Sequence, residues 1–256
     1  CNGGRYPCRK DGTGKGEDVN RFSDTLGGQC TDHRIKGNKN NCGACAPLRR
    51  LHVCDKNLEN MDTNNYDSGK ATHTLLAEVC HAALHEGQSI KDDYVKYQSK
   101  NDDFKTHICT ELARSFADIG DIIRGKDLYR GYDDEEKNRR KQLESNLKRI
   151  FGKIYEGLTT TRGKKEEIEA RYKDTTNFYE LREDWWALNR QEIWKAITCG
   201  APKESKYFRQ TCGGSGKTAT QARNKCRCDD KANTDPPTYF DYVPQYLRWF
   251  EEWAED

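Results

Sequence analysis

The sequence has no long apolar run, and its share of apolar residues is low. Hydrophobic residues make up 34% of the 256 residues and charged residues another 34%, against about 45–50% and about 25% in typical globular domains. No stretch approaches the roughly 20 apolar residues of a membrane-spanning helix, and no basic-then-apolar leader begins the chain. We therefore expect no direct membrane insertion of this chain, and a fold that cannot rely on apolar burial alone.

Cysteine is missing between Cys109 and Cys199 but frequent on both sides of that gap. An even number at close spacing indicates a disulfide framework, which persists only in an oxidising compartment, so we expect the protein to work outside a cytosol. Because the chain starts at Cys1 without Met, we also expect a fragment, with any signal or anchor outside it. All twelve cysteines are expected to be bonded, in a pairing that the sequence leaves open: Cys1, Cys8, Cys30, Cys42, Cys45, Cys54, Cys80, Cys109, Cys199, Cys212, Cys226 and Cys228.

Convincing alternation with period two is also absent, so strands should be few. Residues 1–66 show no sustained period and are rich in Gly, Asn, Asp and Lys, which predicts irregular structure held by cysteines. From about residue 67, apolar residues recur at helical spacing. We predict a mainly α fold, with a disulfide-stapled irregular subdomain over residues 1–66 followed by a helical bundle over residues 67–256.

The helical pattern also predicts where helices begin and end, from glycines, acidic first turns and a capping box. The aromatic stripes on these helices are interpreted as core packing, and that includes Tyr246, Phe250 and Trp253 on the last helix. The predicted boundaries are an end at Gly87, an end at Gly125, a start at Asp133, an end at Gly157, a restart at Asn189 and a start at Pro244.

Recognisable catalytic patterns are missing as well. Residues 213–218 look like the end of a phosphate-binding loop, but Thr211 stands where that loop needs its first Gly. His81 and His85 have the spacing of a metal-binding pair on a helix, yet Ala82 replaces the Glu that a metalloprotease requires. We predict no enzyme activity, no catalytic residue and no cofactor, with a secreted disulfide-rich hydrolase as the remote alternative.

A zinc site is the alternative use of the N-terminal cysteines. Cys42 and Cys45 form a Cys-x-x-Cys pair with Cys54 nearby, as in a zinc knuckle. Such knuckles pair two dyads at regular separation, and the second dyad is missing here. We therefore predict disulfides and no metal.

Positive charge is concentrated in two segments, although the net charge is only +2. Residues 137–153 carry a local charge of +6 and residues 203–231 one of +5. The first segment lies on a predicted helix, with its basic residues mostly away from the apolar face. Such a ridge can attract polyanions such as sulfated glycans; a soluble helix face is the alternative, and nucleic acid is disfavoured because no groove-reading motif is present. The candidate ligand-binding residues are Lys137, Arg139, Arg140, Lys141, Lys148, Arg149 and Lys153.

Three long blocks of sequence carry a family resemblance. They read ARSFADIGDIIRG at residues 113–125, WWALNR at 185–190 and PQYLRWFEEW at 244–253. In this order and separation they resemble the Duffy-binding-like domains, alpha class, of the erythrocyte membrane protein 1 family of Plasmodium falciparum. The resemblance covers essentially the whole chain. It implies that residues 1–66 are similar to the first subdomain of that family and the rest to the second, while the third subdomain, which would begin near the last helix, is absent.

The resemblance implies cell adhesion by a variable surface antigen. Such a domain would lie on the extracellular face of the infected host erythrocyte membrane, as the ectodomain of a membrane-anchored protein under antigenic variation. Its expected partners are host erythrocyte surface receptors, host antibodies, and sulfated glycans or blood-group sugars. The implied activity is rosetting through heparan sulfate-like glycans, blood-group sugars or complement receptor, and a purely protein-binding ectodomain is the alternative. The recognised blocks are apolar scaffold, so binding residues are expected in the charged segments between them.

Overall fold

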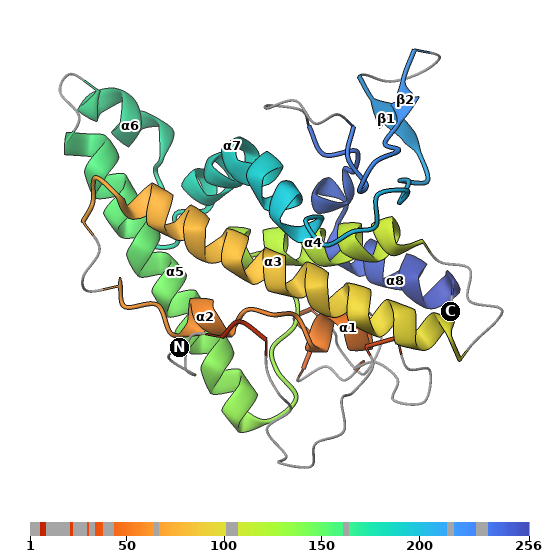
Figure 1. Ribbon diagram of the computed structural model, residues 1–256. Coiled ribbons are helices and arrows are strands. Elements are labelled where there is room, and N and C mark those ends of the chain that lie inside the picture. The colour runs from red at the N-terminus through yellow and green to blue at the C-terminus, as the bar shows by residue number, and fades with distance from the viewer. Residues whose placement is uncertain are drawn as a thin grey trace.

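The protein is mainly helical, as predicted, and the described residues form one small two-stranded sheet (Figure 1). The computed structural model describes residues 6–8, 21–22, 30, 34–37, 44–63, 67–100, 107–160, 164–213, 218–228 and 235–255. In chain order the elements are α1 (Leu48–Leu51), α2 (Lys56–Glu59), α3 (Ala71–Gln98), α4 (Ile108–Arg124), α5 (Asp134–Thr160), α6 (Lys165–Arg171), α7 (Tyr179–Ile197), β1 (Gln210–Cys212), β2 (Thr220–Gln221), the 3₁₀ turn η2 (Phe240–Tyr242) and α8 (Gln245–Glu255).

Helix α4 forms the centre of the molecule and is buried along its whole length. It contacts α1, α3, α7, α8 and η2, and in Figure 1 it lies behind α3, which crosses the front of the molecule. Its Phe116 ring lies 5.1 Å from the ring of Trp186 and 5.2 Å from that of Trp194, both on α7. The helix ends at Gly125, where the left-handed backbone (φ +76°) suits glycine, so this predicted end is confirmed.

Two predicted helix ends are wrong because the glycines allow close packing instead. Helix α3 continues through Gly87 to Gln98, and a Cβ at Gly87 would lie 1.9 Å from the carbonyl oxygen of Ile197 on α7. Helix α5 likewise continues through Gly157, where a Cβ would lie 2.5 Å from the carbonyl oxygen of Ser68. Glycine at these positions lets another backbone approach the helix.

The predicted restart at Asn189 is also wrong, because α7 is continuous from Tyr179 to Ile197. The side-chain amide of Asn189 donates to the carbonyl oxygen of Trp185, one turn earlier, at 2.7 Å. Asn189 therefore does not cap a new helix. The predicted starts of α5 and α8 lie within one residue of the observed ones.

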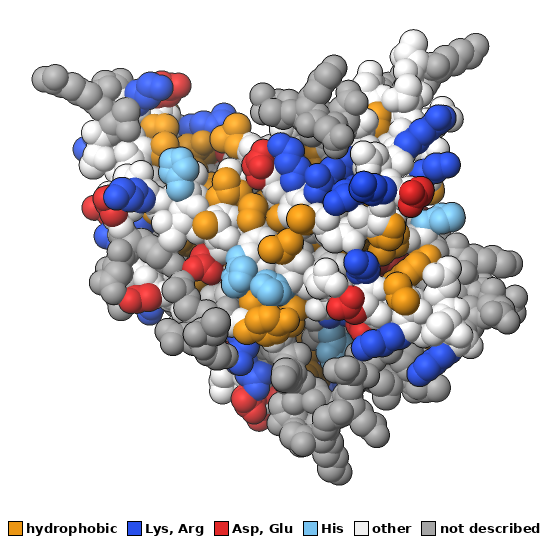
Figure 2. Space-filling view, in the orientation of Figure 1, with side chains coloured by type: hydrophobic (Ala, Val, Ile, Leu, Met, Phe, Trp, Pro, Cys, Tyr) orange, Lys and Arg blue, Asp and Glu red, His pale blue; other side chains and the backbone are white. Residues whose placement is uncertain are grey.

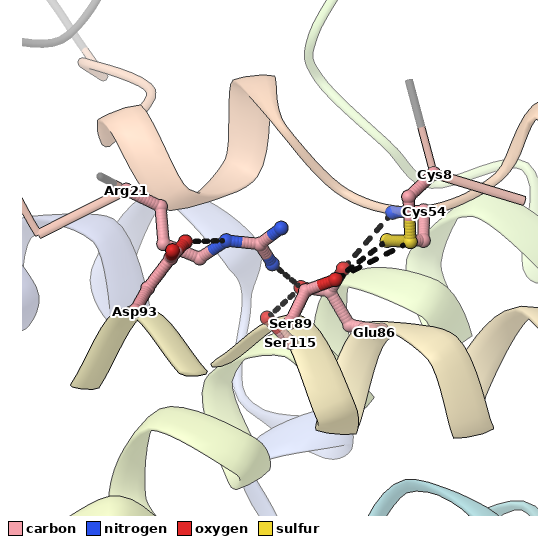
Figure 3. The surroundings of a disulfide bond; sticks show 7 residues. All are labelled: Cys8, Arg21, Cys54, Glu86, Ser89, Asp93 and Ser115. Atoms are coloured by element: carbon pink, nitrogen blue, oxygen red, sulfur yellow. Dashed lines mark hydrogen bonds and ion pairs between the residues drawn. A yellow bond between two sulfur atoms is a disulfide. The ribbon is translucent and has the colours of Figure 1, made fainter. Parts of the chain in front are cut away.

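A disulfide joins two parts of the N-terminal segment, and ionic and hydrogen-bond contacts attach that segment to α3 (Figure 3). Cys8 is bonded to Cys54, whose backbone N–H donates to the Glu86 carboxylate on α3 at 2.9 Å. Arg21 pairs with the same carboxylate at 2.8 Å and with Asp93 at 3.0 Å. The contacts to Glu86 and Asp93 cross the proposed boundary near residue 66, and the division into two subdomains stays a prediction.

Eight of the twelve cysteines are bonded, in the pairs Cys8–Cys54, Cys30–Cys45, Cys109–Cys226 and Cys212–Cys228. Cys1 and Cys42 lie outside the described residues. The prediction is wrong for Cys80 and Cys199, which are free thiols. Gly200, next to Cys199, lies beside Gln88 of α3. That is about 12 Å along the helix from Cys80 at 1.5 Å per residue, whereas a disulfide joins Cα atoms about 4.4–6.8 Å apart.

Helix α8 is docked by charged residues and by one residue of its aromatic stripe, Trp249. Its Arg248 pairs with Asp118 and Asp121 of α4 at 2.7 and 2.6 Å, and its Glu252 pairs with Arg49 of α1 at 2.8 Å. Trp249 is fully buried. The core prediction for the rest of the stripe is wrong: Tyr246, Phe250 and Trp253 are 52%, 74% and 39% exposed.

The described helices include none with both the length and the apolar composition to cross a bilayer. Within the same residues, no group of three or more His, Cys, Asp or Glu side chains is arranged to hold a metal ion. The zinc alternative is wrong for Cys45 and Cys54, since both sulfurs are in disulfides. Residues 214–217 of the loop that resembles a phosphate-binding segment lie outside the described residues.

Candidate functional site

A basic hollow of about 790 Å³ opens between the first half of α5 and the segment that follows α4. Lys137, Lys141 and Lys148 of α5 line one side. Tyr129 and Arg130 line the other. Ile122 and Leu143 add an apolar part to the lining. The lining also includes the acidic residues Asp127 and Glu144, which pair with Arg50 and Arg182 respectively.

The segment after α4 is held rigidly by residues that are distant in sequence. A short antiparallel bridge pairs Tyr129 with Ile35, and the Lys36 ammonium, which also lines the hollow, donates to the carbonyl oxygen of Asp127 at 2.7 Å. The Arg50 guanidinium binds the Asp127 carboxylate. These contacts fix one wall of the hollow before any ligand arrives.

Helical periodicity separates the seven predicted ligand residues into groups. Residues 137, 141 and 148 are spaced by four and seven, which places them on one side of α5. Lys141 and Lys148 make no ion pair with any residue that the structure describes, and Lys137 pairs with the exposed Asp134 at 3.2 Å. These three lysines and Arg140 are the predicted residues that the structure brings to the hollow.

Arg140 contradicts the prediction that the basic residues of this segment lie away from the core. Its side chain is only 10% exposed and pairs with Asp55 and, at 2.9 Å, with Glu136. Although burial opposes the charged form, these two carboxylates raise the pKa of Arg140 above its ordinary value. The charge of Arg140 is therefore neutralised within the fold, and the residue links α5 to the segment between α1 and α2.

The remaining predicted residues lie away from the hollow. Arg139 pairs with Glu135 and Glu136 of its own helix, and Lys153 pairs with Glu156 at 3.1 Å. Arg149 is exposed and lies outside the lining of the hollow. Their predicted role in binding stays a prediction, since the structure does not join them to the other three.

Two residues of the second basic segment, residues 203–231, form hydrogen bonds at the C-terminal end of α7. Arg227 donates to the Lys195 carbonyl oxygen at 2.7 Å and to the Thr198 hydroxyl at 2.8 Å, and Lys225 donates to the Cys199 carbonyl oxygen at 3.1 Å. Cations at a helix C-terminus satisfy carbonyls that lack partners within the helix. Figure 2 shows Lys and Arg side chains over the end of α7 and the loop that follows it.

Sequence reasoning missed the other wall of the hollow, which includes Lys36, Tyr129 and Arg130. Lys36 and Arg130 belong to segments separated by more than ninety residues, and no spacing pattern connects them. The bridge between Ile35 and Tyr129 and the hydrogen bond from Lys36 to Asp127 bring them together in the fold.

Comparison with known proteins assigns the chain to a family. A protein-family model described as the Duffy binding domain matches residues 43–248, which contain α1 to α7 and most of the site. The chain belongs to the Duffy binding domain family. Duffy binding domains are receptor-binding adhesion modules and not enzymes, so the prediction of no enzyme activity is confirmed.

Solved Duffy-binding-like domains of Plasmodium falciparum support the finer resemblance. The NTS-DBL1(alpha-1) domain of the membrane protein PfEMP1 from the varO strain is 42% identical, with a TM-score of 0.73 over 98% of this chain and 51% of that one. A PfEMP1 DBLb domain bound to human ICAM-1 is 31% identical, with a TM-score of 0.67 over 94% of this chain and 46% of that one. The predicted alpha-class resemblance and the Duffy-binding-like fold are therefore confirmed.

Among curated proteins, the Duffy receptor beta form of Plasmodium knowlesi is 24% identical over 89% of this chain and 16% of its own length. The chain thus spans about half the length of the solved domains and about a sixth of the curated receptor. These relatives are surface adhesion proteins of Plasmodium, which agrees with the predicted extracellular setting.

Proposed function

We propose that this Duffy binding domain attaches parasite-infected erythrocytes to host cells by binding an anionic host glycan in the basic hollow. Sulfated glycans of the heparan sulfate type are the leading ligand, and binding to uninfected erythrocytes would produce rosettes. The observation that carries the proposal is the convergence of Lys137, Lys141 and Lys148 on one hollow with few carboxylate partners. Cations left without partners in a concave surface concentrate anionic ligands.

The experiment compares charge reversal in the two basic segments. The Lys141→Glu/Lys148→Glu variant should lose most of its retention on heparin and its binding to erythrocytes. The matched control Lys203→Glu/Lys206→Glu changes the same number of exposed lysines in the other segment and should keep most of both. Enzymatic removal of heparan sulfate from the cells should reduce wild-type binding, whereas removal of blood-group sugars should not. Equal losses in the two variants would show diffuse attraction and would contradict the proposal.

A protein receptor is the second candidate, because the DBLb relative is bound to human ICAM-1. In that case binding to a receptor ectodomain should survive about 0.5 M salt, where the Debye length is only a few ångströms and exposed charges are strongly screened. Binding through the hollow should instead fall steeply with salt, because released counterions drive the association. Surface plasmon resonance between about 0.1 and 0.5 M salt separates the two candidates.

A further inference from the structure

Two histidines of α3, His81 and His85, lie side by side at the surface. They are four residues apart, so they occupy the same face of the helix on successive turns. The centres of the two imidazole rings are 4.8 Å apart. His81 is exposed and His85 is half-buried, and Figure 2 shows histidine side chains next to each other on the face of the molecule that α3 crosses. Solvent therefore has access to the pair.

The ring of His85 is also in contact with the N-terminal segment. The Tyr6 ring meets it edge to face, with ring centres 4.8 Å apart. Tyr6 is close in sequence to Cys8, which is bonded to Cys54. One imidazole of the pair thus has a defined position, while the exposed His81 can change rotamer at little cost.

The fold uses neither imidazole for a polar contact. Neither ring forms a hydrogen bond or an ion pair with a described residue. The carboxylate of Glu78, one turn before His81, accepts a hydrogen bond from the Asn57 side-chain amide at 2.9 Å. A neutral imidazole has one nitrogen lone pair, and it is the commonest metal ligand among protein side chains. The pair is therefore available to an ion from solvent.

The spacing of the two rings suits a single metal ion. Metal–nitrogen bonds of about 2.0–2.1 Å place the centres of two imidazoles roughly 5 Å apart on a tetrahedral ion. The two rings already have this separation, so they need only rotate until one nitrogen of each points to a common position. Helical zinc sites use the same four-residue spacing of histidines.

We propose that His81 and His85 form a surface site for one divalent transition-metal ion, either Zn²⁺ or Cu²⁺, both of which suit imidazole ligands. Mg²⁺ prefers oxygen ligands and should not bind there. Ala82 replaces the Glu of a metalloprotease, which excludes that catalytic pattern but leaves both ligands in place. The described residues add no third His, Cys, Asp or Glu ligand. The other coordination positions are therefore open to water or to a donor atom of another molecule.

The test is isothermal titration of the folded protein with zinc chloride, copper sulfate and magnesium chloride in separate runs at about pH 7.4. The wild type should bind one equivalent of Zn²⁺ or Cu²⁺ at a saturable site and no Mg²⁺. His81→Gln and His85→Gln should each weaken this binding at least tenfold, because even a residue behind a metal ligand contributes about 10–100-fold in affinity. His73→Gln is the matched control and should bind as the wild type does, since His73 is exposed on the same helix with no histidine one turn away.

Nuclear magnetic resonance identifies the ligands directly. Zn²⁺ should shift the imidazole nitrogen resonances of His81 and His85 and leave those of His73 and His107 unchanged. Zn²⁺ should also raise the melting temperature of the wild type but not that of His81→Gln, because an ion that binds only the folded helix stabilises it.

Loss of binding in His81→Gln would not reflect unfolding, because the residue is exposed and the variant should melt at the wild-type temperature in the absence of metal. The site is on α3, outside the lining of the hollow, and does not depend on the proposed function. Three results would each overturn the inference: no saturable binding of Zn²⁺ or Cu²⁺, an equal loss of affinity in His73→Gln and His81→Gln, or metal-induced shifts confined to other histidines.

Discussion

The interior and the basic hollow use cationic side chains in opposite ways. In the interior, Arg49 bonds to Asp118, Glu252 and the hydroxyl of Ser115 at 2.8–2.9 Å, and it thereby joins α1, α4 and α8. In the hollow, Lys141 and Lys148 make no ion pair with a described residue. A guanidinium can bind several carboxylates in fixed geometry, whereas an exposed ammonium remains available for a ligand. Local net charge in a sequence does not distinguish these two uses.

The largest expected effect comes from removing a buried arginine from the interior. Arg49→Met leaves the buried Glu252 carboxylate without its cation and leaves Asp118 with Arg248 alone. The unmatched negative charge should lower the free energy of unfolding by about 3–5 kcal/mol. Lys148→Met, in the hollow, should change it by less than about 0.5 kcal/mol. Urea unfolding followed by circular dichroism measures both. Similar losses in the two variants would contradict the distinction.

A pH effect of intermediate size tests the same ionic contacts. Burial opposes ionisation of Asp118, but the Arg49 and Arg248 guanidiniums outweigh it and lower the pKa of Asp118 to about 2. Because the folded-state pKa lies below the unfolded value, the stabilisation is fully present above about pH 4 and is lost as the pH falls towards 2. At about 1.4 kcal/mol per pKa unit, the charge of Asp118 contributes about 2 kcal/mol at neutral pH.

The variant Asp118→Asn does not titrate and therefore isolates this contribution. The difference between the wild-type and variant free energies of unfolding should shrink by about 1 kcal/mol between pH 7 and pH 3. Urea unfolding at both pH values provides the measurement. A difference that stays constant with pH would show that the arginines do not stabilise the charged form of Asp118.

The smallest expected effect is the difference between two neighbouring basic residues of α5. Arg149 and Lys148 are neighbours in sequence, but only Lys148 lines the hollow. Arg149→Gln should therefore change heparin affinity less than twofold, while Lys148→Gln should weaken it several-fold and reduce the salt dependence by about one counterion. Heparin affinity chromatography at several salt concentrations tests the pair, and an equal effect of both variants would argue for a diffuse surface.

Much of the helical framework could be predicted from the sequence because local signals set it. The apolar stripe of α4 and the left-handed Gly125 fix that helix, and the acidic first turn marks the start of α5. Gly87 and Asn189 misled the prediction, because glycine also permits close packing of helices and asparagine can bond within its own helix. The role of such a residue depends on which other element packs against it in the fold, and the local sequence does not specify that element.

The candidate site could be predicted only in part. Helical spacing was sufficient to place Lys137, Lys141 and Lys148 together, but Arg140 lies one turn from Glu136 and meets Asp55 only in the folded molecule. The wall that contains Tyr129 depends on a bridge to Ile35, far away in the sequence. Burial and long-range pairing decide which cations remain available, and neither is encoded in local charge.

The most direct test of the central claim is a hydrogen-exchange footprint of the protein with a bound heparin oligosaccharide. The account predicts slower exchange in the first half of α5 and in residues 125–130, with little change in residues 203–213 and 218–228. Protection confined to those latter residues, or spread evenly over both basic segments, would contradict the claim that the lysines of the hollow are the cations left available for a ligand.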